Sequence, residues 1–219
     1  MTKPKALIIP VTPFQQNCTL IWCARTRRAA VVDPGGDLDT ISKAISDQGV
    51  TLEKVLLTHG HLDHAGGAAT LGRTYSVPVE GPHADEAFLL DSLEEQARNY
   101  GFPPAENCHP DRWLTDGDSV RFGDLEFGVR HCPGHTPGHV IFFHTGARLA
   151  LVGDVLFAGS IGRTDFPRGN HAQLLRSITE RLWPLGDEIR FVPGHGQMST
   201  FGQERLANPY VSDRVLHRA

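Results

Sequence analysis

The stretch VLLTHGHLDHAGG, residues 55–67, brings three histidines and an aspartate into six positions directly after an apolar run. These residues are His59, His61, Asp63 and His64. The valine and leucines before them are typical of a buried strand, and the residues after His64 fit the start of a helix. Polar side chains of this kind are costly to bury without partners. The stretch therefore predicts a strand that ends in a turn where these groups are gathered for a purpose.

Three further apolar strands, distant in the chain, also run into glycine-containing turns that carry histidine or aspartate. They are VRHCPGHT with His135, LALVGDV with Asp154 and RFVPGHG with His195. A metal site needs side chains that converge from rigid elements, and small residues leave room for an ion and a substrate. Imidazole and carboxylate groups without thiolate suit zinc, iron or manganese at a reactive site.

The first turn can serve more than one ion. In an extended turn, His59, His61 and Asp63 point the same way, and the start of the following helix turns His64 aside. One segment can therefore serve two metal ions.

The rest of the chain predicts strands and helices that bring these turns together. Strands are expected at 6–13, 18–24, 29–36, 54–59, 77–81, 119–123, 125–132, 140–144, 148–154 and 188–196. Helices are expected at 37–49, from after His64 to about Tyr75, and at 83–101, 171–183 and 200–209. Residues 102–110 and 158–170 form loops, and the first of these is long enough to lie over a site. Strands in both halves with helices between and after them predict an α/β protein in which two sheets pack between outer helices, an αβ/βα sandwich.

Composition limits the classes of function. The chain has 219 residues, of which 40% are hydrophobic and 21% are charged, which is enough for one large domain. A net charge of -4 gives no electrostatic reason to expect nucleic acid or an anionic membrane as a partner. The apolar run near the N-terminus is too short for a signal peptide, and no segment approaches the roughly 18 apolar residues of a membrane helix. We therefore expect a cytoplasmic protein.

The four cysteines show no C-x-x-C spacing. Cys18 and Cys23 would face opposite sides of one strand. Reduced thiols with a packing role are favoured, including Cys132, which lies three positions before His135.

The motif H-x-H-x-D-H, followed by a distant histidine, aspartate and histidine, resembles that of the metallo-β-lactamase-fold hydrolases, whose fold is a four-layered αβ/βα sandwich. The resemblance extends over nearly the whole chain through DPGG, GHTPGH, GDVLF, GRTDFPRG and PGHG. It is closest to the short, single-domain glyoxalase-II-like hydrolases of bacteria, of the YcbL type. In binuclear members it implies one metal on His59, His61 and His135, a second on Asp63, His64 and His195, and Asp154 bridging the two.

The resemblance implies two divalent ions, with zinc as the first expectation and iron or manganese as alternatives. Such a pair could hold a bridging water and lower its pKa from about 15.7 toward 7, which would make a hydroxide nucleophile available at neutral pH. Asp63 would orient this water and take its proton. No lysine or tyrosine in the motif segments is an obvious acid for a poor leaving group, which favours a thioester substrate. The resemblance agrees, and implies S-acyl-glutathione such as S-lactoylglutathione.

The chain also departs from classical two-domain glyoxalase II, which carries much of its glutathione site on a C-terminal helical domain. We expect that domain to be missing, because the chain ends 24 residues after His195. The family's glutathione-contacting lysine corresponds to Arg163, and a nearby tyrosine corresponds to Asp165. All lysines precede residue 55, so Arg163 and Arg168 are the candidates for substrate binding. In the alternative reading, Arg163 and Asp165 pair with each other in a structural loop.

His139, four positions after His135, is expected either to orient a metal ligand or to pack in the core, rather than to bind metal. Asp33 in VVDPGG is expected either to hydrogen-bond near the site or to build the turn. The remaining histidines are expected at the surface or in loops, without a role. They are His83, His109, His131, His144, His171 and His217.

The main alternative is a persulfide dioxygenase, which shares the fold and a similar GRTDF stretch. It would use a single iron on His59, His135 and Asp154 to activate oxygen. A β-lactamase, a lactonase or a nuclease is less favoured, and a non-catalytic metal-binding module is a distant third. The sequence leaves the oligomeric state open.

Overall fold

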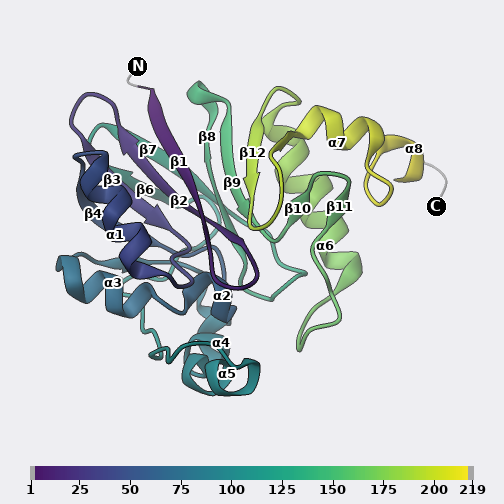
Figure 1. Cartoon of the computed structure of the whole chain (residues 1–219). Helices are drawn as coiled ribbons and strands as arrows, with labels where there is room; N and C mark the ends of the chain where they lie inside the picture. The colour runs from purple at the N-terminus through teal and green to yellow at the C-terminus, as the bar shows by residue number, and fades with distance from the viewer. Residues whose placement is uncertain (1–2, 217–219) are drawn as a thin grey trace.

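Two β-sheets pack face to face in the middle of the molecule, and helices cover both outer sides (Figure 1). This arrangement comes from a computed structural model that describes residues 3–216. The predicted four-layered αβ/βα sandwich is confirmed.

The first sheet has the order β1-β2-β3-β4-β5. Its strands β1 to β3 are antiparallel, whereas β4 pairs in parallel with both β3 and β5. The bounds are β1 (Pro4–Val11), β2 (Gln16–Cys23), β3 (Arg28–Val32), β4 (Thr51–Leu56) and β5 (Val79–Glu80).

The second sheet has the order β13-β12-β9-β8-β7-β6, in which only the β9–β12 pair is parallel. A separate two-stranded hairpin pairs β10 with β11. The bounds are β6 (Ser119–Phe122), β7 (Leu125–His131), β8 (Val140–His144), β9 (Leu149–Gly153), β10 (Leu156–Phe157), β11 (Ser160–Ile161), β12 (Arg190–Pro193) and β13 (Ser199–Thr200).

The helices lie on the outer faces and at one end of the sheets (Figure 1). On the side of the first sheet are α1 (Leu38–Asp47), α2 (Leu62–Ala65), α3 (Ala68–Tyr75), the 3₁₀ turn η1 (Ala84–Glu86), α4 (Ala87–Leu90) and α5 (Leu93–Tyr100). On the side of the second sheet are α6 (His171–Ser177), the π-helical turn η3 (Ile178–Leu182), the 3₁₀ turn η4 (Trp183–Leu185), α7 (Phe201–Ala207) and α8 (Asp213–Leu216), and the 3₁₀ turn η2 (Thr145–Ala147) joins β8 to β9. Within residues 3–216, no helix has the length and apolar character needed to cross a membrane.

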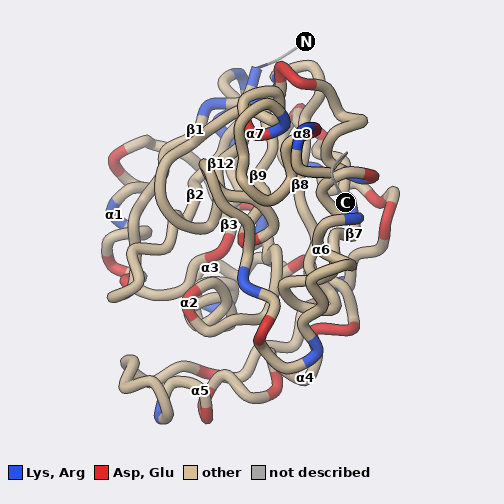
Figure 2. The backbone as a smooth tube through the Cα atoms, turned by 90° about the vertical axis from the view of Figure 1, so that its right-hand side faces the viewer, with Lys and Arg blue, Asp and Glu red and all other residues tan. Residues whose placement is uncertain are grey.

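Successive side chains of a strand point to opposite faces of its sheet, and this divides the buried apolar residues among three core layers. In β2, Cys18 and Leu20 face the helices of the first outer layer, whereas Ile21 and Cys23 face the second sheet. The two cysteines thus lie on opposite faces of the strand, as predicted. All four cysteines are free and buried. Basic and acidic residues are scattered over the described backbone (Figure 2).

The parallel strand pairs end level with one another, which positions the polar turns. Val32 at the end of β3 pairs with Leu56 at the end of β4, and Gly153 of β9 pairs with Pro193 of β12. The segments that follow these strands therefore meet at one edge of the sandwich, where α2 begins (Figure 1).

The single helix predicted over 83–101 is wrong, because α4 and α5 are separate helices. Ser92 Oγ donates hydrogen bonds to the carbonyls of Phe88 and Leu89, both at 3.0 Å. Its hydroxyl competes with backbone N–H groups for these acceptors, which ends α4. The loop 102–110, which is long enough to lie over a site, packs against the first outer core through Phe102, Ala105 and Cys108.

Three short elements escaped prediction. The β10–β11 hairpin begins before the predicted 158–170 loop and continues into it, and its two-residue strands are too short to show a period. The strand β13 and the final helix α8 are equally short.

Phe142 is fully buried between the two sheets, so its removal would leave a cavity in the central core. We expect Phe142→Ala to lower the free energy of unfolding by about 3–5 kcal/mol, measured by urea denaturation. Leu206→Ala on α7 is the control, because Leu206 is 77% exposed, and it should change stability by less than about 0.5 kcal/mol. Equal losses in both variants would contradict the assignment of the central core.

Candidate metal centre

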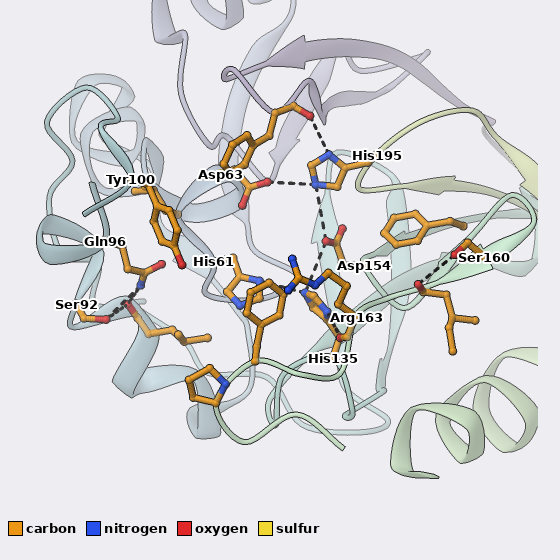
Figure 3. Close-up of a pocket in the computed structure, with 17 residues that line it drawn as sticks. His61, Asp63, Ser92, Gln96, Tyr100, His135, Asp154, Ser160, Arg163 and His195 are labelled. Atoms are coloured by element: carbon orange, nitrogen blue, oxygen red, sulfur yellow. Dashed lines mark hydrogen bonds and ion pairs between the residues drawn. The ribbon is translucent and has the colours of Figure 1, made fainter. Parts of the chain in front are cut away.

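The seven residues of the predicted metal motif lie together at the shared edge of the two sheets. Five of them line a cavity of about 970 Å³, and in Figure 3 the labelled ones face one another on its floor. The set comprises His59, His61, Asp63 and His64 after β4, His135 between β7 and β8, Asp154 after β9 and His195 after β12.

Three imidazole nitrogens converge at one side of this floor. His61 Nδ1 lies 3.1 Å from both His59 Nε2 and His135 Nε2. Burial lowers the pKa of all three rings, to about 3 for His61. They are therefore neutral at pH 7, which is the state that binds metal.

A second cluster consists of Asp63, His64 and His195. His195 Nε2 lies 3.1 Å from Asp63 Oδ2, and His64 Nε2 lies 3.7 Å from the same oxygen. Burial would raise the pKa of Asp63, but His64 and His195 outweigh it and the pKa is lowered. This cluster therefore offers an ionised carboxylate and two imidazoles.

Asp154 lies between the two clusters. Its Oδ2 is 3.6 Å from His135 Nε2 and 3.7 Å from His195 Nε2, and its Oδ1 is 3.3 Å from His64 Nε2. The carboxylate is buried, yet these histidines hold its pKa well below the ordinary value. Asp154 can thus be shared by two ions.

The donor set fits a pair of cations. Asp154 Oδ1 and His64 Nε2 are buried, and neither has a well-aligned hydrogen-bond partner within residues 3–216. Unsatisfied buried groups of this kind are rare in proteins unless a ligand completes them. Two carboxylates and five imidazoles also match the ligand preference of zinc, iron and manganese.

Four of the five histidines are held by a neighbour at the ring nitrogen that faces away from the centre, which fixes their orientation. The contacts are His59 Nδ1 with Thr58 Oγ1 (3.1 Å), His64 Nδ1 with Asp33 Oδ2 (3.0 Å), His135 Nδ1 with the carbonyl of Arg163 (2.7 Å) and His195 Nδ1 with the carbonyl of Phe14 (3.1 Å).

Asp33 and His139 both lie beside the centre. Asp33 accepts hydrogen bonds from the Thr58 N–H at 2.7 Å and the Thr58 hydroxyl at 2.6 Å, in addition to its contact with His64. His139 Nε2 accepts the backbone N–H of Asp154 at 3.1 Å, and its ring stacks on His59 at 4.6 Å. Both contacts orient predicted ligands.

Sequence reasoning missed Gln16, which is buried with its Nε2 3.3 Å from His64 Nδ1. No local pattern distinguishes a glutamine at the start of a strand. It also missed the carbonyls of Phe14 and Arg163, because backbone contacts do not depend on side-chain identity.

The two candidate arginines have different surroundings. Arg163 lines the cavity, but its guanidinium pairs with Asp165 at 2.8 Å and lies 4.6 Å from the Phe166 ring centre. The alternative in which Arg163 pairs with Asp165 therefore describes this structure. Arg168 lies 4.1 Å from the Phe88 ring centre and is not among the lining residues of the cavity.

The cavity walls are largely apolar. They come from the β1–β2 loop, α4, α5 and the segment from β10 to residue 167, and include Phe14, Leu89, Tyr100, Phe157, Ile161, Phe166 and Pro167. Ser92, Gln96 and Ser160 add neutral polar groups. A substrate with an apolar portion fits these walls.

The five described histidines without a predicted role do not line the cavity. His217 falls outside the described residues. His83 and His131 stack at 4.4 Å beside Asp85, and His144 Nδ1 accepts the N–H of Ala147.

The profile of the metallo-beta-lactamase superfamily matches residues 11–195. A relative from Haemophilus influenzae, named hydroxyacylglutathione hydrolase GloC, is 44% identical over 208 residues. The match covers 94% of this chain and 98% of the relative.

Solved structures agree with this assignment. BLEG-1 B3 metallo-beta-lactamase superposes with a TM-score of 0.87 at 35% identity, over 94% of this chain and 99% of its own. TTHA1623 in a di-iron-bound form gives 0.85 at 33% identity, over 94% and 100%. ETHE1 from Myxococcus xanthus gives 0.79 at 25% identity, over 97% and 88%. The chain therefore belongs to the metallo-β-lactamase superfamily and is a metal-dependent hydrolase.

Proposed function

We propose that the protein is a thioesterase that hydrolyses S-acyl-glutathione, such as S-lactoylglutathione, with two divalent metal ions. The observation that carries the proposal is the placement of Asp154 between two ligand clusters on the floor of an open cavity. The 44% identity to the relative named hydroxyacylglutathione hydrolase supports the substrate class. A cytoplasmic location is also proposed, since four free buried cysteines suit a reducing compartment.

In this proposal His59, His61 and His135 hold one ion, Asp63, His64 and His195 hold the other, and Asp154 contacts both. Bound divalent ions would lower the pKa of water toward neutrality and polarise the carbonyl under attack. Zinc is our first expectation, and the di-iron form of TTHA1623 supports iron as the alternative.

Asp63 is the proposed catalytic residue. Its carboxylate lines the cavity, and its lowered pKa keeps it ionised at neutral pH. It can therefore orient a water molecule and accept a proton from it. The cavity lining contains no lysine, and Tyr100 lies on the wall away from Asp154 (Figure 3). A leaving group that departs as a thiolate does not need a strong acid at this position.

The second candidate is a persulfide dioxygenase with one iron on His59, His135 and Asp154. The 3.6 Å between His135 Nε2 and Asp154 Oδ2 is compatible with a shared ion. A di-iron relative also supports iron in this superfamily.

Metal content and activity on one preparation separate the candidates. We expect about two divalent ions per chain by elemental analysis, hydrolysis of S-lactoylglutathione, and no oxygen uptake with glutathione persulfide. Removal of metal by a chelator should abolish hydrolysis, and added zinc should restore it. Fewer than two ions together with oxygen uptake would overturn the thioesterase proposal, as would a preference for a β-lactam substrate.

Arg163→Ala should raise KM for S-lactoylglutathione by about 3- to 10-fold and leave kcat unchanged, because the guanidinium would bind a substrate carboxylate in competition with Asp165. Arg168→Ala is the matched control, since its guanidinium lies over Phe88. Steady-state kinetics with both variants make the comparison. An unaltered KM in Arg163→Ala would remove this side chain from substrate binding.

The metal-free protein should lose stability as pH falls from 6.5 to 5. Burial lowers the pKa values of His59, His61, His135 and His139 in the folded state, so only the unfolded chain gains protons on these rings in this range. His64, His195 and Glu86 have raised pKa values in the folded state, so their contributions oppose this trend, but the four histidines with lowered pKa values outweigh these three groups.

We expect the free energy of unfolding to fall by about 2 kcal/mol or more over this range, measured by urea denaturation after chelation. Zinc-saturated protein at pH 7.5 should be more stable than the stripped protein. Constant or rising stability toward pH 5 in the stripped protein would contradict the buried neutral histidines.

A further inference from the structure

Glu86 is a fully buried carboxylate outside the metal centre, at the junction of η1 and α4. Its Oε2 accepts the backbone N–H of Gly60 at 2.8 Å, and its Oε1 accepts that of Gly138 at 2.6 Å. Gly60 separates His59 from His61, and Gly138 directly precedes His139. One carboxylate therefore joins the two turns that supply the three-histidine cluster.

The two glycines are explained by the closeness of this contact. A Cβ on Gly60 would lie 2.8 Å from Leu89 Cβ and 3.2 Å from Glu86 Oε2, and a Cβ on Gly138 would lie 2.7 Å from Glu86 Cγ. Neither glycine has a positive φ, so backbone conformation does not require glycine at these positions. The η1–α4 junction packs directly on both backbones, and this approach excludes any side chain.

The contact is reinforced from the same segment. The backbone N–H of His83 donates to the carbonyl of Gly138 at 3.1 Å, so both backbone polar groups of Gly138 are bound by the segment that carries Glu86. Burial raises the pKa of Glu86 to about 7, although the hydrogen bonds from the backbone of Gly60 and Gly138 oppose the rise. A carboxylate buried at such a cost is expected to do more than fill space.

Helix α4, which begins directly after Glu86, also faces the cavity. Leu89, three residues after Glu86, lines the cavity wall, and Phe88 lies under the guanidinium of Arg168. Glu86 itself is not among the lining residues, so it has no direct contact with a substrate in the cavity. It connects the wall to the metal turns through the backbone.

We propose that Glu86 is a positioning residue, which holds the His59–His61 turn and the His135–His139 turn at the separation that the three-histidine cluster needs to bind one metal ion. This inference rests on the metal centre of the proposed function. Its role is to hold the three histidines in place, and their burial already keeps them in the neutral form that binds metal.

Glu86→Gln tests the proposal with a side chain of nearly the same shape. The amide offers one acceptor oxygen, and its NH₂ group would face the N–H of the other glycine, so one turn loses its bond. We expect the ion on His59, His61 and His135 to bind at least about 10-fold more weakly, while the Asp63 cluster keeps its ion. Competition with a chromophoric chelator for zinc should then show two sites of separate affinity.

Kinetics give a second readout. At limiting zinc, kcat of Glu86→Gln should fall while KM for the thioester stays constant, and excess zinc should restore kcat. A shift in the visible spectrum of the cobalt-substituted protein should accompany the weaker site. A purely structural role would lower thermal stability without changing either the spectrum or the zinc affinity.

Glu204→Gln is the matched control. Glu204 is also a buried carboxylate, and it accepts the backbone N–H of Gly159 at 2.8 Å, but it contacts neither metal turn. The Glu204→Gln variant should be less stable than the wild type and should bind zinc at both sites with unchanged affinity. Glu86→Asp keeps both acceptor oxygens on a shorter stem and should give an intermediate affinity, which tests the proposal even if Glu86→Gln does not fold.

The outcomes are separable from those of the proposed function. A wild-type protein that binds no metal would overturn both. Wild-type protein with two ions, together with Glu86 variants that bind both as tightly, would overturn the role of Glu86 alone.

Discussion

The electrostatic cost of burying five imidazoles and two carboxylates within a few ångströms is the constraint on which the rest of the structure depends. Imidazoles in the three-histidine cluster are too desolvated to carry protons, and Asp154 is held ionised by the rings around it. Such a group of side chains is favourable only when cations complete it, so each ligand must be held in place before the ion arrives. The level ends of the parallel strand pairs provide this rigidity on both sides of the centre.

The outer contacts of the ligands extend the same constraint into the backbone. Rings are fixed by Thr58, Asp33 and the carbonyls of Phe14 and Arg163. Glu86 fixes the backbone of the two turns that carry His59, His61 and His135. The Arg163 carbonyl orients His135 while its side chain lies at the cavity. The cavity lining and the orientation of the candidate ligands therefore share parts of the chain.

The sequence predicted the sandwich and the meeting of the seven polar residues, because each of the four turns that carry them follows an apolar strand and contains glycine. It did not predict the break at Ser92, since the apolar spacing continues through that residue and only the hydroxyl contacts reveal the competition. Gln16 and Glu86 also escaped notice. Gln16 lies just before the strand predicted over 18–24, and Glu86 lies in the helix wrongly predicted to be continuous over 83–101. Their partners are distant in the chain, so no local signal marks them.

The cavity floor and the cavity walls come from different parts of the fold, which affects how this protein can change over time. The floor of the cavity is built from strand ends that belong to the two sheets, whereas the walls come from short segments outside them. Mutations in these segments can alter the shape of the space above the centre without moving the strands beneath it. The wall at Leu89 differs, because a Cβ on Gly60 would lie only 2.8 Å from Leu89 Cβ, so this part of α4 packs directly against the His59–His61 turn. Selection for a new substrate could therefore change most of the wall, whereas the α4 backbone at Leu89 must keep its place against that turn.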